Sequence, residues 1–253
     1  MYFDTHAHYD DEAFDADRET LLASMEASAV RLIVDPGCDE ASSRHAVELA
    51  HAWPFVYAAV GWHPENAETF DEQSVALLRS WTADSRVKAI GEIGLDYHYE
   101  TPPREIQKRV FTRQMELAEE LGLPVIVHDR EAHADSLEII RRFPGVTGVF
   151  HCFSGSAEMA RQLVQIGWYV GFTGVVTFKN ARRALEAAAA CPIDRILLET
   201  DAPYMAPVPY RGKRCDSRML PYMAQAIAQV RQITAQEVAQ AAAENGKRLF
   251  HIG

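Results

Sequence analysis

Histidine and carboxylate side chains follow short apolar runs at several widely separated places in the chain. His6 and His8 come after the apolar residues near the N-terminus, and side chains two apart on an extended segment point the same way. Further residues of these types end other apolar runs, and the full candidate set is His6, His8, Glu92, His128, His151 and Asp201. Imidazole nitrogens suit zinc, iron or manganese, and carboxylates also suit magnesium. The set therefore predicts a divalent-metal site.

The size of this set indicates more than one metal ion. A lone histidine beside a strand is usually only a satisfied polar residue, and a four-coordinate site needs fewer ligands than the chain offers. Two ions that share a bridging carboxylate account for the whole set. Such a pair, about 3.5–4 Å apart, stabilises both the attacking and the leaving oxygen of a displacement, so hydrolysis is the expected chemistry.

Bringing separated residues together requires a repeating scaffold, and the chain shows one. Short β-branched or apolar runs alternate with longer amphipathic stretches. The stretch 104–121 has helical spacing, Pro102 and Pro103 just before it, and Gly122 at the usual C-cap position. Strands that alternate with helices indicate βαβ units and a parallel sheet. The candidate strands are residues 2–5, 31–34, 55–60, 87–90, 125–127, 146–150, 168–171 and 196–198.

Eight such units predict an α/β fold of the (β/α)8 TIM-barrel type, formed by a single domain over residues 1–253. An open doubly wound sheet is the competing architecture. In a barrel the C-terminal ends of the strands converge on one face, where active sites lie. The stretch 220–250 predicts two helices that are broken near Ile233, with Thr234 and Glu237 as a capping box.

Composition limits the partners of the chain. No stretch approaches the roughly 20 apolar residues of a membrane helix, the N-terminus shows no secretory signal, and four scattered cysteines indicate reduced thiols. A cytoplasmic protein without membrane partners is expected. The net charge of −11 argues against tight non-specific duplex binding. Any nucleic-acid contact should therefore be local, through a few basic loops.

Several motifs, in order and over nearly the whole chain, resemble those of the TatD family of metal-dependent deoxyribonucleases, within the amidohydrolase-like barrels. The motifs are jointly highly specific, although each alone is weak. They are Asp4-Thr5-His6-Ala7-His8, Val60-Gly61-Trp62-His63-Pro64, Ile90-Gly91-Glu92-Ile93-Gly94-Leu95-Asp96-Tyr97, Leu123-Pro124-Val125-Ile126-Val127-His128, Phe150-His151-Cys152-Phe153-Ser154-Gly155, Leu198-Glu199-Thr200-Asp201-Ala202-Pro203, Arg211-Gly212-Lys213-Arg214 and Asn245-Gly246-Lys247-Arg248-Leu249-Phe250.

The resemblance implies a division of the ligands between two divalent ions, Mg²⁺, Mn²⁺ or Zn²⁺. One ion would be held by His6, His8 and Asp201. The second would be held by His128 and His151, and Glu92 would bridge the two. Asp201 would also orient or deprotonate the metal-bound water, whose pKa the ion lowers, and the resulting hydroxide would be the nucleophile.

The resemblance also implies substrate contacts. His63 would touch the scissile phosphate, whereas its alternative is a structural histidine before Pro64. Arg211 and Lys213 lie in the loop after the last strand and would bind phosphate, although an ordinary solvated basic loop is the alternative. The sequence departs from the family pattern at residues 215–217, which puts contacts near Cys215 in doubt, and at residues 129–130.

The expected function is cleavage of phosphodiester bonds in DNA, by a 3′–5′ exonuclease that acts on single-stranded ends and works as a monomer. The end preference rests on the resemblance alone. The alternative is hydrolysis of a carbonyl substrate, such as an amide or an aminoacyl-tRNA ester, by the same metal site. A third hypothesis is a non-catalytic binding protein, which the intact ligand set argues against.

Overall fold

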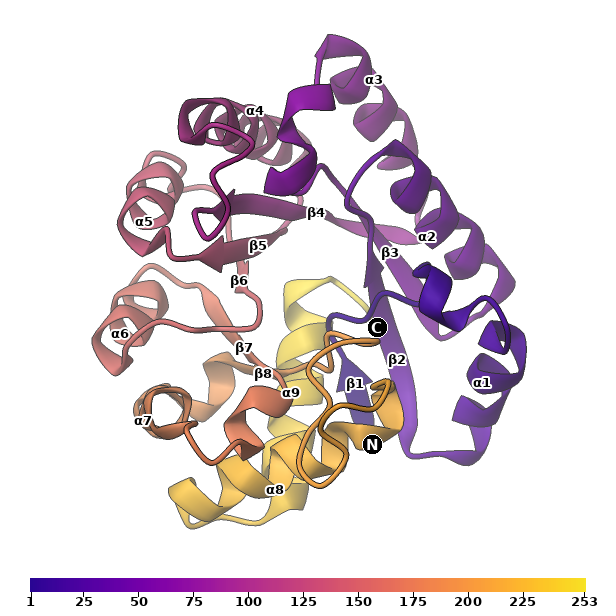
Figure 1. Cartoon of the computed structure of the whole chain (residues 1–253), viewed down its shortest axis with the longest axis vertical. Helices are drawn as coiled ribbons and strands as arrows, with labels where there is room; N and C mark the ends of the chain where they lie inside the picture. Colours follow the sequence, from indigo (N-terminus) through magenta and orange to yellow (C-terminus); the bar gives the residue numbers. More distant parts are fainter. The chain divides into compact units, whose positions relative to one another are not determined.

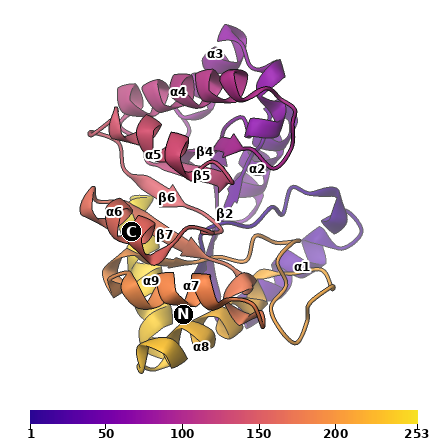
Figure 2. The same ribbon diagram turned by 60° about the vertical axis from the view of Figure 1, so that its left-hand side comes forward.

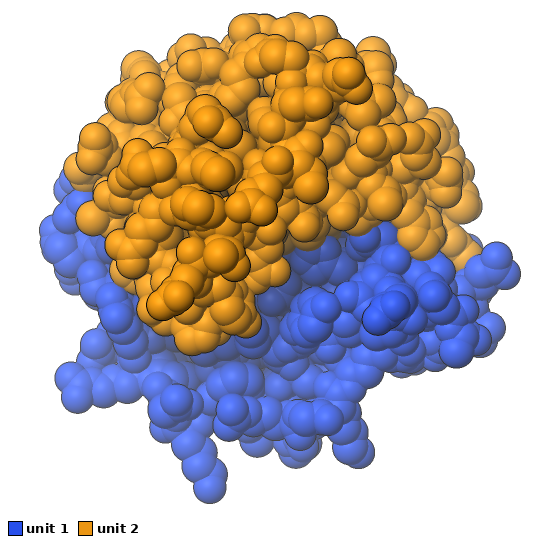
Figure 3. All heavy atoms as spheres, turned by 45° about the horizontal axis from the view of Figure 1, so that its top comes forward, with its two compact units in different colours: residues 1–35, 151–253 blue, residues 36–150 orange.

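The computed structural model describes all 253 residues. The chain divides into two compact units, coloured separately in Figure 3. Unit 1 comprises Met1–Asp35 and His151–Gly253, and unit 2 comprises Pro36–Phe150. None of the helices is both long enough and apolar enough to cross a membrane.

Unit 2 contains four consecutive parallel strands and their helices. Strand β3 pairs with β4, β4 with β5, and β5 with β6, each in parallel. Figure 1 shows α4 and α5 on the outer side of β4 and β5. The elements are α2 (Glu40–Ala52), β3 (Val56–Val60), α3 (Glu72–Trp81), β4 (Val87–Asp96), α4 (Arg104–Leu121), β5 (Val125–Arg130), α5 (His133–Arg141) and β6 (Gly148–Phe150).

Unit 1 contains the other four strands, which come from both ends of the chain. Strand β1 pairs with β2, and β7 with β8, again in parallel. Helices α6 to α9 pack on one another in chain order (Figure 2). The elements are β1 (Tyr2–Asp4), α1 (Arg18–Ser24), β2 (Val30–Pro36, whose last residue falls in unit 2), α6 (Ala157–Gln165), β7 (Tyr169–Phe172), α7 (Arg182–Ala190), β8 (Ile196–Leu198), α8 (Leu220–Arg231) and α9 (Ala235–Leu249).

The last strand lies beside the first. The backbone N–H of Thr5 donates to the carbonyl of Leu198, and Ala7 and Ala202 form a parallel bridge. The eight strands follow one another in chain order in one sheet. Because an open sheet would leave β1 and β8 unpaired, the alternative architecture is wrong and the predicted (β/α)8 barrel is confirmed.

Two predicted strand ends lie too early in the chain. Strand β4 continues to Asp96 and β5 to Arg130, so Glu92 and His128 lie within strands rather than after them. Pairing of β4 with β5 continues to the last residue of each, after an irregularity between Ile90 and Ile93. Gly94 allows this close approach, since a Cβ there would lie 2.0 Å from the carbonyl oxygen of His128.

The helix signals in the sequence are confirmed. Helix α4 covers the predicted residues, and Gly122 caps it with a left-handed φ of 64°. Helix α9 begins with the Thr234–Glu237 capping box, in which each side-chain oxygen accepts a hydrogen bond from the other residue's backbone N–H. The buried face of α4, with Val110, Phe111 and Leu117, lies against the sheet of unit 2.

A buried glutamine fixes the loop that follows β3. The side-chain oxygen of Gln114 accepts from the backbone N–H of Trp62 at 2.8 Å, and its amide nitrogen donates to the Trp62 carbonyl at 3.0 Å. Gln114 is fully buried. Both main-chain groups of Trp62 therefore depend on one side chain of α4.

We expect Gln114→Ala to lower the free energy of unfolding by about 2–4 kcal/mol, because a buried donor and a buried acceptor lose their partners. Urea denaturation measures this loss. Gln73→Ala, at an exposed position of α3, is the matched control and should stay within about 0.5 kcal/mol of wild type. Equal midpoints for the two variants would contradict the assigned role of Gln114.

Candidate metal centre

Three side chains of unit 1 form a compact group of potential metal ligands. His6 Nε2 lies 3.0 Å from His8 Nε2, and each of these nitrogens lies 3.7 Å from Asp201 Oδ1. All three residues are buried. A point equidistant from the three atoms lies about 2.0 Å from each, which is a usual zinc–nitrogen bond length. The group therefore fits a divalent cation, and the predicted convergence of these three residues is present within unit 1.

The local chain conformation explains this convergence. His6 and His8 follow β1 on an extended segment, and their side chains share a side because they are two residues apart. The backbone N–H of Asp201 donates to the carbonyl of His6 at 2.9 Å, which ties the end of β8 to the end of β1. Asp201 has a φ of 57°, a left-handed value that is unusual for a non-glycine residue. Such strained positions concentrate at functional sites.

His151 and Glu199 lie next to this group. The ring of His151 stacks on that of His6, with centroids 3.9 Å apart. Glu199 is fully buried, its Oε1 lies 3.8 Å from His151 Nδ1, and it accepts a hydrogen bond from the backbone N–H of Cys152. Burial raises the pKa of Glu199 to about 8, although nearby His151 opposes the shift. Glu199 is thus a buried acidic neighbour of His151 to which the sequence argument assigned no role.

Unit 2 holds a second group of potential ligands. His128 Nδ1 lies 2.9 Å from Glu92 Oε1, and His63 Nε2 lies 3.6 Å from the same oxygen. Glu92 is buried within β4, and the backbone of His63 is held by its N–H, which donates to the carbonyl of Cys38. Glu92, His128 and His63 thus lie close together within unit 2.

A carboxylate absent from the predicted set holds the other side of His128. Asp96, buried at the end of β4, places Oδ2 3.0 Å from His128 Nε2. Burial by itself lowers the pKa of His128, but the carboxylates of Asp96 and Glu92 outweigh it and raise the pKa to about 10. Carboxylates that bond the second nitrogen of a ligating histidine orient the ring. Asp96 stood in the family-like motif but had no assigned role.

The first histidine pair has similar support from acidic residues of unit 1. Asp10 Oδ1 lies 3.8 Å from His8 Nδ1. Asp35 is fully buried, and burial together with the neighbouring Asp10 carboxyl raises its pKa well above the usual range. Asp4 accepts from both the backbone and the hydroxyl of Thr200, one residue before Asp201. The acidic residues around the His6–His8 pair were the available sequence signal for this support.

The predicted basic loop follows β8 within unit 1, and its cations differ in their partners. Arg214 donates to both carboxylate oxygens of Asp17, at 2.7 and 2.6 Å. Arg211 instead lies over the ring of Phe178, 4.3 Å from its centroid. Lys213 and Arg211 make no ion pair with an acidic side chain. Arg214 is therefore a structural residue, whereas the two residues predicted to bind phosphate remain available for a ligand.

Asp96→Asn tests the support of His128. We expect binding of one equivalent of Zn²⁺ to weaken about 10–100-fold, because the ring loses the carboxylate that orients it. Isothermal titration of metal-free protein measures the change. Asp135→Asn is the matched control, since that carboxylate bonds Tyr97 and Lys108 and touches no candidate ligand. Unchanged Zn²⁺ affinity in Asp96→Asn would remove Asp96 from the site.

The raised pKa of Glu199 predicts that the stability of the metal-free protein depends on pH. Its folded pKa, about 8, exceeds the ordinary value of 4.5, so the stabilisation is complete below about pH 4.5 and is lost as pH rises toward 8. Between about pH 5 and pH 8, wild type should lose at least about 2 kcal/mol relative to Glu199→Gln, which stays neutral. Urea denaturation in chelator gives both curves, and parallel curves would exclude this titration.

Comparison with known proteins agrees with the geometry. The family model described as "TatD related DNase" matches residues 3–251. The chain is 42% identical over 254 residues to "Uncharacterized metal-dependent hydrolase YabD" of Bacillus subtilis (strain 168), with 100% of each chain covered. It is 37% identical over 243 residues to "3'-5' ssDNA/RNA exonuclease TatD" of Cronobacter sakazakii, with 90% of each covered.

A solved structure also covers the whole chain. The crystal structure of YJJV, a TatD homologue from Escherichia coli K12, has a TM-score of 0.91 at 32% identity and covers 100% of this chain and 98% of its own. The fold, the candidate ligands and the relatives agree. The chain therefore belongs to the TatD-related DNase family and is a metal-dependent hydrolase of that family.

Proposed function

We propose that this protein is a two-metal phosphodiesterase that removes nucleotides from the 3′ ends of single-stranded DNA. The observation that carries the proposal is the His6–His8–Asp201 group, whose spacing fits one divalent cation. A bound divalent cation supplies Lewis acidity toward a phosphoryl oxygen and lowers the pKa of water. Both effects of the cation favour hydrolysis, which is the reaction expected of this family.

The second cation is proposed from the fold. In a (β/α)8 barrel the C-terminal ends of the strands share one face, and both ligand groups lie at such ends. We infer that His128 and His151 hold the second ion and that Glu92 bridges the pair. Asp96 supports this assignment because it keeps the ring of His128 oriented beside Glu92.

His63 suits a phosphate better than a cation. Its Nδ1 accepts a hydrogen bond from the backbone N–H of Glu65 at 3.2 Å, so a neutral ring carries its proton on Nε2. A protonated Nε2 donates to an oxygen and does not ligate a metal. We therefore retain for His63 a contact to the scissile phosphate, and for Asp201 the role of proton acceptor for the attacking water.

The charge of the protein supports a short, single-stranded substrate. A net charge of −11 opposes the phosphate neutralisation that tight binding of an extended duplex requires. Arg211 and Lys213 are the proposed local phosphate contacts, because neither is ion-paired with the protein. The exonuclease named among the relatives acts on single-stranded DNA and RNA, which gives the substrate class proposed here.

A screen of metals against substrates tests the proposal. Metal-free protein is reloaded with Mg²⁺, Mn²⁺ or Zn²⁺ and is given 3′- and 5′-labelled single-stranded DNA, duplex DNA and a simple carboxylic ester. We expect turnover of single-stranded DNA from the 3′ end. Asp201→Asn and Glu92→Gln should each lower kcat/KM about 10³-fold, about 4 kcal/mol of barrier.

Asp194→Asn, an exposed carboxylate of the same unit, is the matched control and should retain wild-type activity. Turnover of the ester alone would reject the nuclease and favour the carbonyl hydrolase. Full DNA cleavage by Asp201→Asn would reject the assigned metal group.

A further inference from the structure

A pocket of unit 1 carries positive charge only. The pocket has a volume of about 540 Å³ and is walled by the loop that follows β8 and by Phe178. Its charged residues are Arg211, Lys213 and Arg214, and no acidic residue lines it. In a protein with a net charge of −11 this is a local concentration of positive charge. The pocket is therefore suited to an anion.

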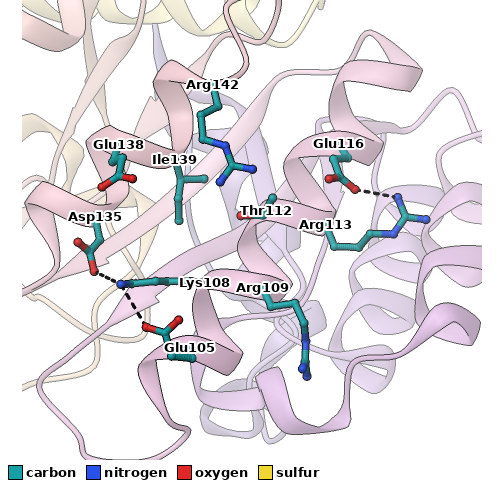
Figure 4. A pocket seen from close by; sticks show the side chains of 10 residues that line it. All are labelled: Glu105, Lys108, Arg109, Thr112, Arg113, Glu116, Asp135, Glu138, Ile139 and Arg142. Atoms are coloured by element: carbon teal, nitrogen blue, oxygen red, sulfur yellow. Dashed lines mark hydrogen bonds and ion pairs between the residues drawn. The ribbon is translucent and has the colours of Figure 1, made fainter.

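The groove between α4 and α5 in unit 2 provides the contrast. Both acidic and basic residues line it, and Figure 4 shows Lys108 between Glu105 and Asp135. The Lys108 nitrogen lies 2.7 Å from Asp135 and 3.4 Å from Glu105. These charges compensate one another within the protein. In the basic pocket after β8, only Arg214 is paired with an acidic side chain, and Arg211 and Lys213 are not.

The same pocket exposes apolar surface. Tyr204 is 54% exposed and Met205 is 40% exposed, although both line the pocket. An aromatic ring offers a stacking surface for any base, since every base has a π-face. A pocket with an exposed ring beside unpaired cations matches the two parts of a nucleotide, an aromatic base and a phosphate.

Tyr204 is fixed at both of its ends, close to the metal ligands of unit 1. Its backbone N–H donates to the carbonyl of Asp201 at 2.8 Å, and its hydroxyl donates to Asp11 Oδ2 at 2.8 Å. Asp201 is a candidate ligand, and Asp11 lies three residues after His8. The ring is thus held between the two segments that carry the His6–His8–Asp201 group.

The cations are positioned by the same loop. The Arg214–Asp17 ion pair attaches the loop to the segment before α1, which Figure 2 shows beside it. Arg211 lies over Phe178, and a guanidinium stacked in this way keeps the N–H groups at its edge available for phosphate oxygens. Lys213 adds a second charge on the same wall.

We propose that this pocket is a nucleotide subsite in which Tyr204 stacks on one unpaired base while Arg211 and Lys213 bind the adjoining phosphates. The inference rests on the proposed function and adds how the substrate is selected. A base that stacks on Tyr204 has left its own helix, so duplex ends must fray before they bind. Selection of single strands then arises at this subsite.

Binding to metal-free protein tests the subsite without cleavage. The probe is a fluorescent five-nucleotide thymidine strand, compared with the same strand carrying abasic units. We expect wild type to bind the base-bearing strand about 10-fold more tightly or better, and Tyr204→Ala to lose this preference. Tyr204→Phe, which keeps the ring, should restore most of it.

Removal of Arg211 or Lys213 should change binding in a different way from removal of Tyr204. Arg211→Ala and Lys213→Ala should weaken both strands equally and lower the salt dependence of binding, since about one phosphate contact is lost in each. Arg183→Ala, an exposed residue on α7 that lines no described pocket, is the charge-matched control and should bind like wild type. A base preference that survives Tyr204→Ala would overturn the subsite.

Cleavage separates this inference from the proposed function. The ratio of kcat/KM for base-bearing and abasic strands should fall from about 10 or more to near 1 in Tyr204→Ala, and a ratio is insensitive to the amount of folded enzyme. If wild type cleaves DNA but this kcat/KM ratio is the same in wild type and in Tyr204→Ala, the subsite is rejected and the proposed nuclease is kept. Base-dependent binding without cleavage in any metal rejects the proposed nuclease and keeps the subsite.

Discussion

The close approach of His6, His8 and Asp201 is the constraint on which the candidate centre depends. Three electron-rich atoms within 3.7 Å of one another, in buried surroundings, are costly unless a cation or a proton lies among them. The barrel enforces this arrangement, because the carbonyl of His6 accepts from the backbone of Asp201 where β8 meets β1. The strands thus hold ligands together that would separate in water. A divalent cation bound among these atoms would replace their mutual repulsion with attraction, so the preformed group would bind the cation more tightly.

Several buried acidic residues accompany this group of ligands. Asp4, Asp35, Asp96 and Glu199 are buried near candidate ligands, and Asp4 and Asp96 bond Thr200 and His128 there. Burial raises the pKa of Glu199 to about 8, whereas hydrogen bonds from His128 lower that of Asp96 despite its burial. At Asp96 the hydrogen-bonded imidazole outweighs burial, whereas at Glu199 burial outweighs the nearby imidazole of His151. In the proposed function, the carboxylates near the ligands attract cations, whereas the positive charge of the pocket after β8 binds phosphate.

The sequence was informative where local physics determines structure. Apolar runs predicted eight strands, and Pro103 with Gly122 marked both ends of α4. The extension of β4 to Asp96 was missed, because it depends on pairing with β5 and on a close approach that only Gly94 permits. The support of His128 by Asp96 was missed for the same reason. The motif Arg211-Gly212-Lys213-Arg214 also could not show that Arg214 pairs with Asp17 whereas Arg211 does not. That difference depends on the position of Asp17, which is distant in the sequence.

The attachment of Tyr204 links base recognition to the position of the scissile bond. Its backbone N–H donates to the carbonyl of Asp201, and its hydroxyl donates to Asp11 Oδ2, on the two segments that hold the metal ligands of unit 1. In the proposed subsite, a base that stacks there lies close to Asp201, because the backbone of Tyr204 is bonded to the Asp201 carbonyl. Binding of the base therefore also restricts which phosphate reaches the ligands. Orientation of this kind lowers a reaction barrier as well as improving affinity, so a single residue can contribute both to strand selection and to rate.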